Sequence, residues 1–100
     1  MKLGILVNSD KHAQDVVGIA KAALAKGHEV TIFNMDAGTK LLGDPTFSTL
    51  CQMQGVSMSF CDHSAKNWDI SKEGIPQDIV CGSQYNHAAM IHEADRIIVL

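Results

Sequence analysis

The sequence predicts an α/β fold with three layers, α/β/α, built around a mainly parallel sheet of about five strands. Short apolar runs alternate along the chain with stretches whose apolar residues recur at helical spacing. The first and last runs are apolar at nearly every position, which is typical of strands buried on both faces. Glycine, proline or a capping residue stands at most of the boundaries. Repeated alternation of this kind builds a parallel sheet with right-handed crossovers and helices on both faces.

The first strand is expected at residues 3–7, followed by a polar loop over residues 8–11. Apolar residues then return at helical spacing, at Ala13, Val16, Val17, Ala20 and Leu24. Gly27 is placed to end this helix, and residues 29–33 form the second strand, rich in β-branched side chains. Ser9 and Asp10 are interpreted as caps of the helix.

A second helix is expected to start at Asp44 and Pro45, a capping carboxylate followed by a proline at the first helical position. It ends at Gly55, and the third strand follows at residues 56–60. Phe47, Leu50 and Cys51 share one helix face, so Cys51 is interpreted as a core residue.

Residues 62–78 form the longest irregular stretch, with one helical turn expected at residues 65–70. Trp68 and Ile70 either line this loop or fill the core beneath it, and the core interpretation is preferred. A fourth strand at residues 79–81 then leads to a helix capped by Ser83, and a fifth strand occupies residues 96–100.

Composition excludes several classes of function. One hundred residues suffice for a single domain with one core. Eight Lys and Arg residues are scattered through a chain of net charge −3, which argues against a nucleic-acid surface. No apolar run is long enough to cross a membrane, and no signal-peptide core follows Lys2. Three cysteines cannot all pair within the chain, so a cytoplasmic protein with reduced thiols is expected.

Cys61 is the first candidate for chemistry. It ends the third strand and is followed at once by Asp62, His63 and Ser64, where open α/β sheets place their reactive groups. A helix N-terminus or a nearby cation favours the thiolate, which is the nucleophilic form of cysteine. The alternative interpretation is packing, because a free cysteine is usually a small buried hydrophobic residue.

Cys81 competes with Cys61 for this role. It also ends a strand, and it precedes the helix start at Gly82 and Ser83. If the two thiols lay close together at the carboxyl edge of the sheet, a disulfide or a relay between them would be possible.

Three segments resemble one protein family. They are AALAKGHEVTIF at residues 22–33, MDAG with the Leu41 and Leu42 pair after it, and GSQYNHAAMIHEADRIIVL at residues 82–100. All three are similar to the DsrE/DsrF/TusD-like sulfur-relay family, and the resemblance spans nearly the whole chain, as one domain over residues 1–100. The segment CDHSA at residues 61–65 resembles the site where active members carry the cysteine that accepts persulfide sulfur. Trp68 and Asp69 stand where an Arg-Gly pair is common in the family.

The resemblance implies a sulfur carrier, sulfurtransferase-like in its chemistry, that takes persulfide sulfur onto Cys61 without a cofactor. It also implies sulfur donor and acceptor proteins as partners, and a homo-oligomer, as a dimer, trimer or hexamer. Backbone N–H groups after Cys61, with the Ser64 hydroxyl, are expected to support the thiolate, and His63 to stabilise it or shuttle a proton. Asp62 and Asp69 are expected to raise the thiol pKa, and His63 or Lys66 to supply a compensating positive charge.

Three other functions are weighed against this one. A zinc or copper site would use the thiol and imidazole groups, but there is no Cys-x-x-Cys pair, and His87 and His92 are five residues apart on different sides of a helix. A nucleotide or flavin site is disfavoured because the loop at residues 8–11 has no glycine and carries an aspartate. The third is a non-catalytic oligomeric subunit with idle thiols, whose apolar surface would be provided by methionines at positions 35, 53, 58 and 90. The same methionines are equally compatible with packing in the core.

Overall fold

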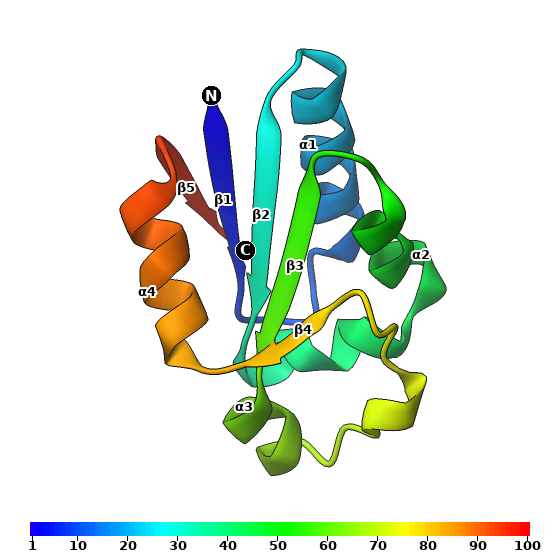
Figure 1. The fold of residues 1–100 in the computed structure, drawn as a ribbon. Helices are drawn as coiled ribbons and strands as arrows, with labels where there is room; N and C mark the ends of the chain where they lie inside the picture. The colour runs from blue at the N-terminus through cyan, green and yellow to red at the C-terminus, as the bar shows by residue number, and fades with distance from the viewer.

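The computed structural model describes residues 1–100, and its centre is a five-stranded sheet in the order β4-β3-β2-β1-β5 (Figure 1). All four strand pairings are parallel, which confirms the predicted fold class. The strands are β1 (Lys2–Val7), β2 (Glu29–Asn34), β3 (Val56–Cys61), β4 (Val80–Gly82) and β5 (Arg96–Val99).

The helices are distributed unequally over the two faces of this sheet. One face carries the larger core, which includes residues of α1 (Ala13–Ala25), of the 3₁₀ helix η1 (Asp36–Gly43) and of α2 (Pro45–Ser48). The 3₁₀ helix η2 (Thr49–Gln52) continues α2, so the single helix expected before Gly55 is divided in two. The other face is covered by α4 (Gln84–Glu93) alone, whose Met90 packs on Leu6 and Phe33.

Strand β3 divides its side chains between these faces by simple alternation. Met58 and Phe60 belong to the larger core, whereas Cys61 joins the small cluster of Leu6, Phe33 and Met90 under α4. The strand extends one residue further than expected, and Cys61 lies on its serine-bearing side, as the alternation predicts.

Most of the predicted helix boundaries are confirmed by their caps. Gly27 follows α1 with φ of 84°, a conformation that glycine adopts without strain. The Asp44 carboxylate accepts the N–H of Thr46 at 3.0 Å, directly before Pro45. At α4 the Ser83 hydroxyl accepts the N–H of Tyr85 at 3.2 Å, and the side chain of Asn86 accepts the N–H of Ser83 at 3.1 Å.

The expected caps of the first helix are wrong. Helix α1 begins at Ala13, and His12 precedes it without a side-chain cap. Ser9 instead donates its hydroxyl to the Leu100 carbonyl at 3.0 Å, and the Asp10 carboxylate lies 3.9 Å from the Lys40 amine. Both residues therefore contact distant parts of the chain, which a local capping pattern does not reveal.

The segment after Cys61 also differs from expectation. Helix α3 (Asp62–Asn67) begins immediately after the strand instead of at residue 65, and the 3₁₀ helix η3 (Lys72–Gly74) follows it. Trp68 is 43% exposed, with the Lys40 amine 4.3 Å from the ring centroid, so its assignment to the core is wrong. Ile70 does pack against the larger core.

Of the two interpretations of the methionines, packing in the core holds for Met58 and Met90. Met58 and Met90 are buried, one in each cluster, and Met35 and Met53 are half-buried against the same clusters. None of the helices has the length and apolar character needed to cross a membrane.

Candidate functional site

The candidate site lies where the carboxyl ends of β3 and β4 meet the starts of two helices (Figure 1). Cys61 is the last residue of β3 and the residue that caps α3, and Gly82 is its partner in the register of β4. Helix α4 begins two residues after Gly82 and leaves the sheet on the face where Cys61 points. The local order of strand and helix therefore places this thiol between two helix N-termini.

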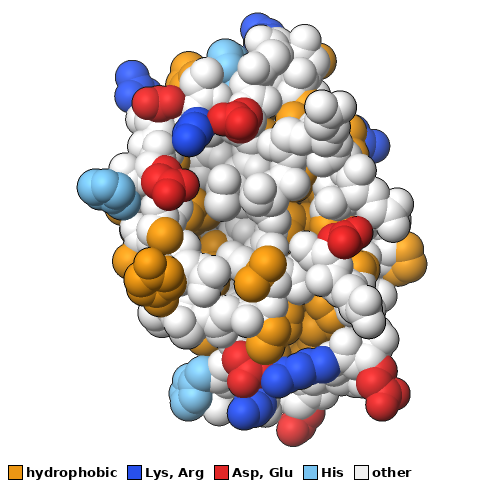
Figure 2. Space-filling view, in the orientation of Figure 1, with side chains coloured by type: hydrophobic (Ala, Val, Ile, Leu, Met, Phe, Trp, Pro, Cys, Tyr) orange, Lys and Arg blue, Asp and Glu red, His pale blue; other side chains and the backbone are white.

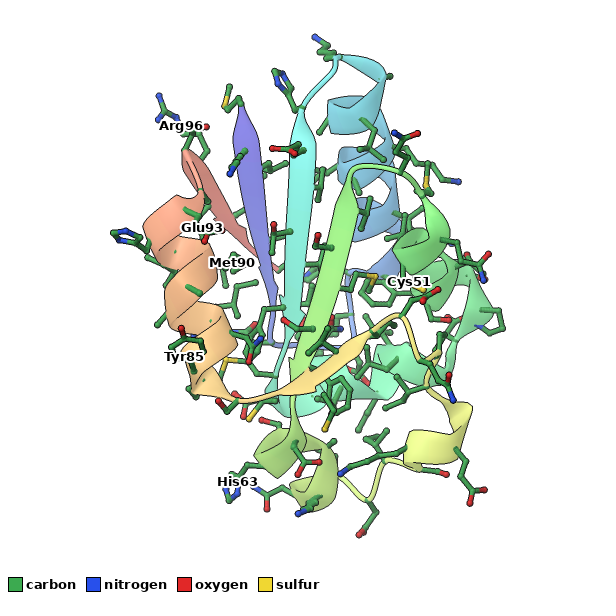
Figure 3. All side chains as sticks on the ribbon, viewed as in Figure 1. Cys51, His63, Tyr85, Met90, Glu93 and Arg96 are labelled. Carbon is green, nitrogen blue, oxygen red and sulfur yellow. The ribbon has the colours of Figure 1, made fainter.

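A cleft of about 750 Å³ opens over the Cys61 thiol. Its walls come from the segment after β2, the first turn of α3 and the start of α4. The residues that line it together with Cys61 include Met35, Asp36, His63, Ser64, Gln84 and Tyr85. His63 and Tyr85 mark the α3 and α4 sides of this region (Figure 3).

Opposing effects act on the Cys61 thiol. Its side chain is only 4% exposed, and this burial raises the pKa. Hydrogen bonds to the sulfur from the Ser64 hydroxyl and N–H, from the Gln84 side chain and from the His63 N–H outweigh that effect, so the pKa is lowered overall. Because hydrogen bonds to the charged form favour it, these donors hold the thiol toward thiolate.

The expected influence of acidic neighbours on this thiol is wrong. Asp62 forms ion pairs with Lys72 and, at 3.2 Å, with Lys66, and these contacts lower the Asp62 pKa to about 2. The pKa of Cys61 is lowered overall, and neither Asp62 nor Asp69 is among the main causes that act on it. Lys66 does not provide a counter-charge for the thiol either, because it pairs with Asp62 on its own helix.

Ser64 and His63, the two residues expected to support the Cys61 thiolate, contact it in different ways. The Ser64 side chain is buried and its hydroxyl reaches the sulfur of Cys61. His63 reaches the sulfur with its backbone N–H, whereas its side chain is exposed and points away from the fold (Figure 3).

Cys81 does not share the cleft with Cys61. Its register partner is Phe60, so its side chain lies on the opposite face of the sheet. It is exposed beside a separate hollow lined by Lys72 and Ile75, and burial together with the Asp62 carboxylate raises its pKa. Because the two thiols point to opposite faces, the disulfide or direct relay considered above does not fit this arrangement.

Cys51 lies in η2, half-buried, and packs against the larger core. Burial, together with the charge of Asp78, raises its pKa. All three cysteines are free, and only Cys61 has its pKa lowered.

Comparison with known proteins decides the family. The sequence model of the DsrE/DsrF-like family matches residues 1–100. The chain belongs to the DsrE/DsrF-like family. Its structure is similar to the crystal structure of the YchN protein from E. coli, with a TM-score of 0.73. The similarity covers 99% of this chain and 97% of YchN at 12% sequence identity, which shows a shared fold. No curated protein sequence matches this chain.

Within this DsrE/DsrF-like fold, Gln84 is the site residue that sequence reasoning missed. It is the first residue of α4, directly after the Ser83 cap, and its side chain lines the cleft. The available signal was positional, because Gly82 and Ser83 were already expected at the carboxyl edge beside Cys61. Which side chain of the new helix would turn toward the thiol depends on how α4 crosses the sheet.

The histidines considered as metal ligands are separated in this DsrE/DsrF-like structure. The His87 ring stacks on Phe33, whereas His92 is exposed in the last turn of α4. No three His, Cys, Asp or Glu side chains are grouped closely enough to hold a metal ion.

Proposed function

We propose that this DsrE/DsrF-like protein carries persulfide sulfur on Cys61 and passes it between protein partners. The observation that carries the proposal is the position of the Cys61 thiol at the wall of an open cleft with a lowered pKa, whereas the pKa values of the other two thiols, which lie elsewhere, are raised. A thiolate is the form that attacks sulfur, so Cys61 is the best nucleophile of the three cysteines.

The proposed transfer is a displacement at sulfur. The Cys61 thiolate attacks the outer sulfur of a donor persulfide, R–S–SH, and a new S–S bond forms to Cys61. The S–S bond of the donor breaks, and the donor leaves as its own thiolate, R–S⁻. The product is a Cys61 persulfide, and its outer sulfur leaves by the same reaction in the direction of an acceptor thiolate. No oxidant, reductant or cofactor is consumed.

The shape of the site favours a partner that inserts a narrow group. Cys61 is 4% exposed, so a flat surface would not reach its sulfur, whereas the cleft of about 750 Å³ admits a cysteine persulfide held on a loop. We therefore infer protein donors and acceptors that present their cysteine on a protruding segment. A reduced thiol is required throughout, which suits the cytoplasm.

A second candidate function uses the same fold without the chemistry. In that case the protein is a non-catalytic oligomeric binding or regulatory subunit whose thiols are idle. The observation that favours it is the low exposure of Cys61, which packs with Leu6, Phe33 and Met90 as an ordinary core residue does.

Sulfur loading separates the two candidates. The Cys51→Ser/Cys81→Ser double variant, which keeps only Cys61, is incubated with glutathione persulfide and digested, and the added sulfur is located by mass spectrometry. We expect one added sulfur atom on the Cys61 peptide. The Cys61→Ser variant, which keeps the other two thiols, is the matched control and is expected to load far less. Absence of sulfur on Cys61, while a small-molecule thiol in the same solution is loaded, would rule out the carrier function.

A further inference from the structure

Gln84 and Cys61 line the same cleft from different elements, the first turn of α4 and the end of β3, and a hydrogen bond from the Gln84 side chain is among the causes that lower the Cys61 pKa. The start of α4 is fixed by the reciprocal capping bonds between Ser83 and Asn86, so the Gln84 backbone is held firmly. The orientation of its side-chain amide is a separate question, since the amide has a donor end and an acceptor end of nearly equal size.

His87 determines that orientation. The Oε1 atom of Gln84 lies 2.9 Å from Nδ1 of His87, one turn further along α4. With its oxygen engaged by the His87 N–H, the amide directs Nε2 at the sulfur atoms of the cleft, and Nε2 donates to Sδ of Met35 at 3.9 Å. A flipped amide would point a carbonyl oxygen at the Cys61 sulfur and repel its thiolate.

The His87 ring is itself held in place. It stacks on the ring of Phe33, with centroids 5.4 Å apart and planes 11° from parallel. Phe33 is fully buried in the same small cluster as Cys61. Phe33 of β2 therefore fixes the His87 ring, and the His87 ring fixes the side-chain amide of Gln84 beside Cys61.

We propose that His87 is a positioning residue for the Cys61 thiolate, acting through Gln84, whose amide N–H it orients toward the sulfur. Gln84 and His87 would then both support sulfur transfer at Cys61, and this biological role rests on the proposed function. Its physical content, the ionisation of one thiol, can be measured without any sulfur transfer.

The Cys61 thiolate is stabilised by neutral hydrogen-bond donors, although charged and titratable groups also lie around it. Asp36 approaches from the segment after β2, and Asp62 and His63 from α3, while α4 contributes Tyr85 and His87. Asp62 is paired with lysines, and the causes that lower the Cys61 pKa are hydrogen bonds from Ser64, Gln84 and His63. Loss of one oriented donor should therefore have a measurable effect.

The test is the pH profile of Cys61 alkylation by iodoacetamide in the Cys51→Ser/Cys81→Ser protein, with thiolate absorbance as a second readout. His87→Phe keeps a flat ring against Phe33 and removes the N–H. We expect the Cys61 pKa to rise by about half to one unit, which is about a threefold to tenfold loss of thiolate below the pKa. His87→Asn, whose amide nitrogen can replace Nδ1 as donor, is expected to restore most of the wild-type profile.

Two further variants complete the design. His92→Phe removes an exposed histidine from the same helix and is expected to leave the profile unchanged. Gln84→Glu replaces the N–H donor by a carboxylate oxygen and is expected to raise the Cys61 pKa more than His87→Phe does, so it tests the geometry even if the latter variant folds poorly.

The proposal is overturned if His87→Phe keeps the parental pKa, if His87→Asn shifts it as much as His87→Phe, or if Gln84→Glu leaves it unchanged. A different pair of results concerns the proposed function. If the thiol pKa responds as expected but Cys61 accepts no sulfur, the positioning role stands and the carrier function fails.

Discussion

At Cys61, burial and hydrogen bonding act on the thiol in opposite directions, and the hydrogen bonds prevail. The family pattern suggests an arginine near this cysteine, and the chain has Trp68 and Asp69 in its place. Backbone and side-chain dipoles supply the stabilisation instead, at the N-terminus of α3 and from Gln84 on α4. A buried thiol can be ionised by such fixed dipoles because they need no reorganisation.

A pair of neighbouring substitutions tests this interpretation of the thiol. Ser64→Ala removes a hydroxyl donor from the sulfur with little change in volume, so we expect the Cys61 pKa to rise and alkylation at neutral pH to slow several-fold. His63→Ala removes an exposed side chain but keeps the N–H that reaches the sulfur, and it is expected to leave the pKa unchanged. Equal effects of the two substitutions in an alkylation assay would contradict this assignment.

At the scale of elements, the cleft depends on how η1 leaves β2. Gly38 lies in η1 against the end of β1, where an added Cβ would meet the backbone carbonyl of Val7. Its own carbonyl accepts the side-chain amide of the buried Asn34 at 2.8 Å. This close approach holds the preceding residues, Met35 and Asp36, at the wall of the cleft.

Two glycine substitutions within η1 test that close approach. Gly38→Ala would force backbone against backbone, and we expect a loss of about 1–3 kcal/mol in the free energy of unfolding. Gly43→Ala is the matched control, because no atom lies within 4 Å of an added Cβ there and the effect should stay within about 0.5 kcal/mol. Urea denaturation measures the free energy of unfolding of both variants. Equal stability would show that the backbone near Val7 can move to accommodate the added Cβ without a large cost.

Two lysine contacts explain why the segment after Cys61 is more ordered than its sequence suggests. Asp62 in the first turn of α3 pairs with Lys66 within the helix and with Lys72 at the start of η3. The carboxylate also favours the helix start through the helix dipole. The ion pair between Asp62 and Lys72 therefore holds the loop after α3 close to the end of β3.

At the scale of the whole molecule, the unequal covering of the sheet leaves apolar surface exposed. Large apolar side chains are exposed on the side of α4 and at both edge strands, at Val80, Tyr85, Ile91, Ile97 and Val99. Figure 2 shows hydrophobic side chains on the visible face, near the start of α4 and around β4. Exposed apolar groups of this size are a common property of interfaces between subunits.

We therefore expect the protein to form a homo-oligomer in solution. Light scattering should give a mass that is a multiple of 10.8 kDa, the mass of one chain, over a range of micromolar concentrations. Burial of the exposed apolar groups is the physical reason, and a mass of one chain at every concentration would contradict the expectation.

The sequence alone was sufficient for the fold class and for the five strands, because these have local causes. Continuous apolar runs predicted the buried parallel strands, and Asp44, Pro45 and Ser83 predicted helix starts that the structure confirms. Alternation along β3 also predicted that Cys61 lies on the side opposite Met58 and Phe60. These signals act within one or two turns of chain, so no knowledge of distant contacts was needed.

Only the tertiary structure decided the surroundings of each thiol. It separated Cys81 from Cys61 by placing them on opposite faces, paired Asp62 with Lys72, turned Gln84 toward the cleft and placed the His87 ring against the Gln84 amide. Each of these facts depends on how α4 and η3 pack against strands that are distant in sequence. The charge and hydrogen bonds around a group depend on its neighbours in space, and a linear pattern does not contain them.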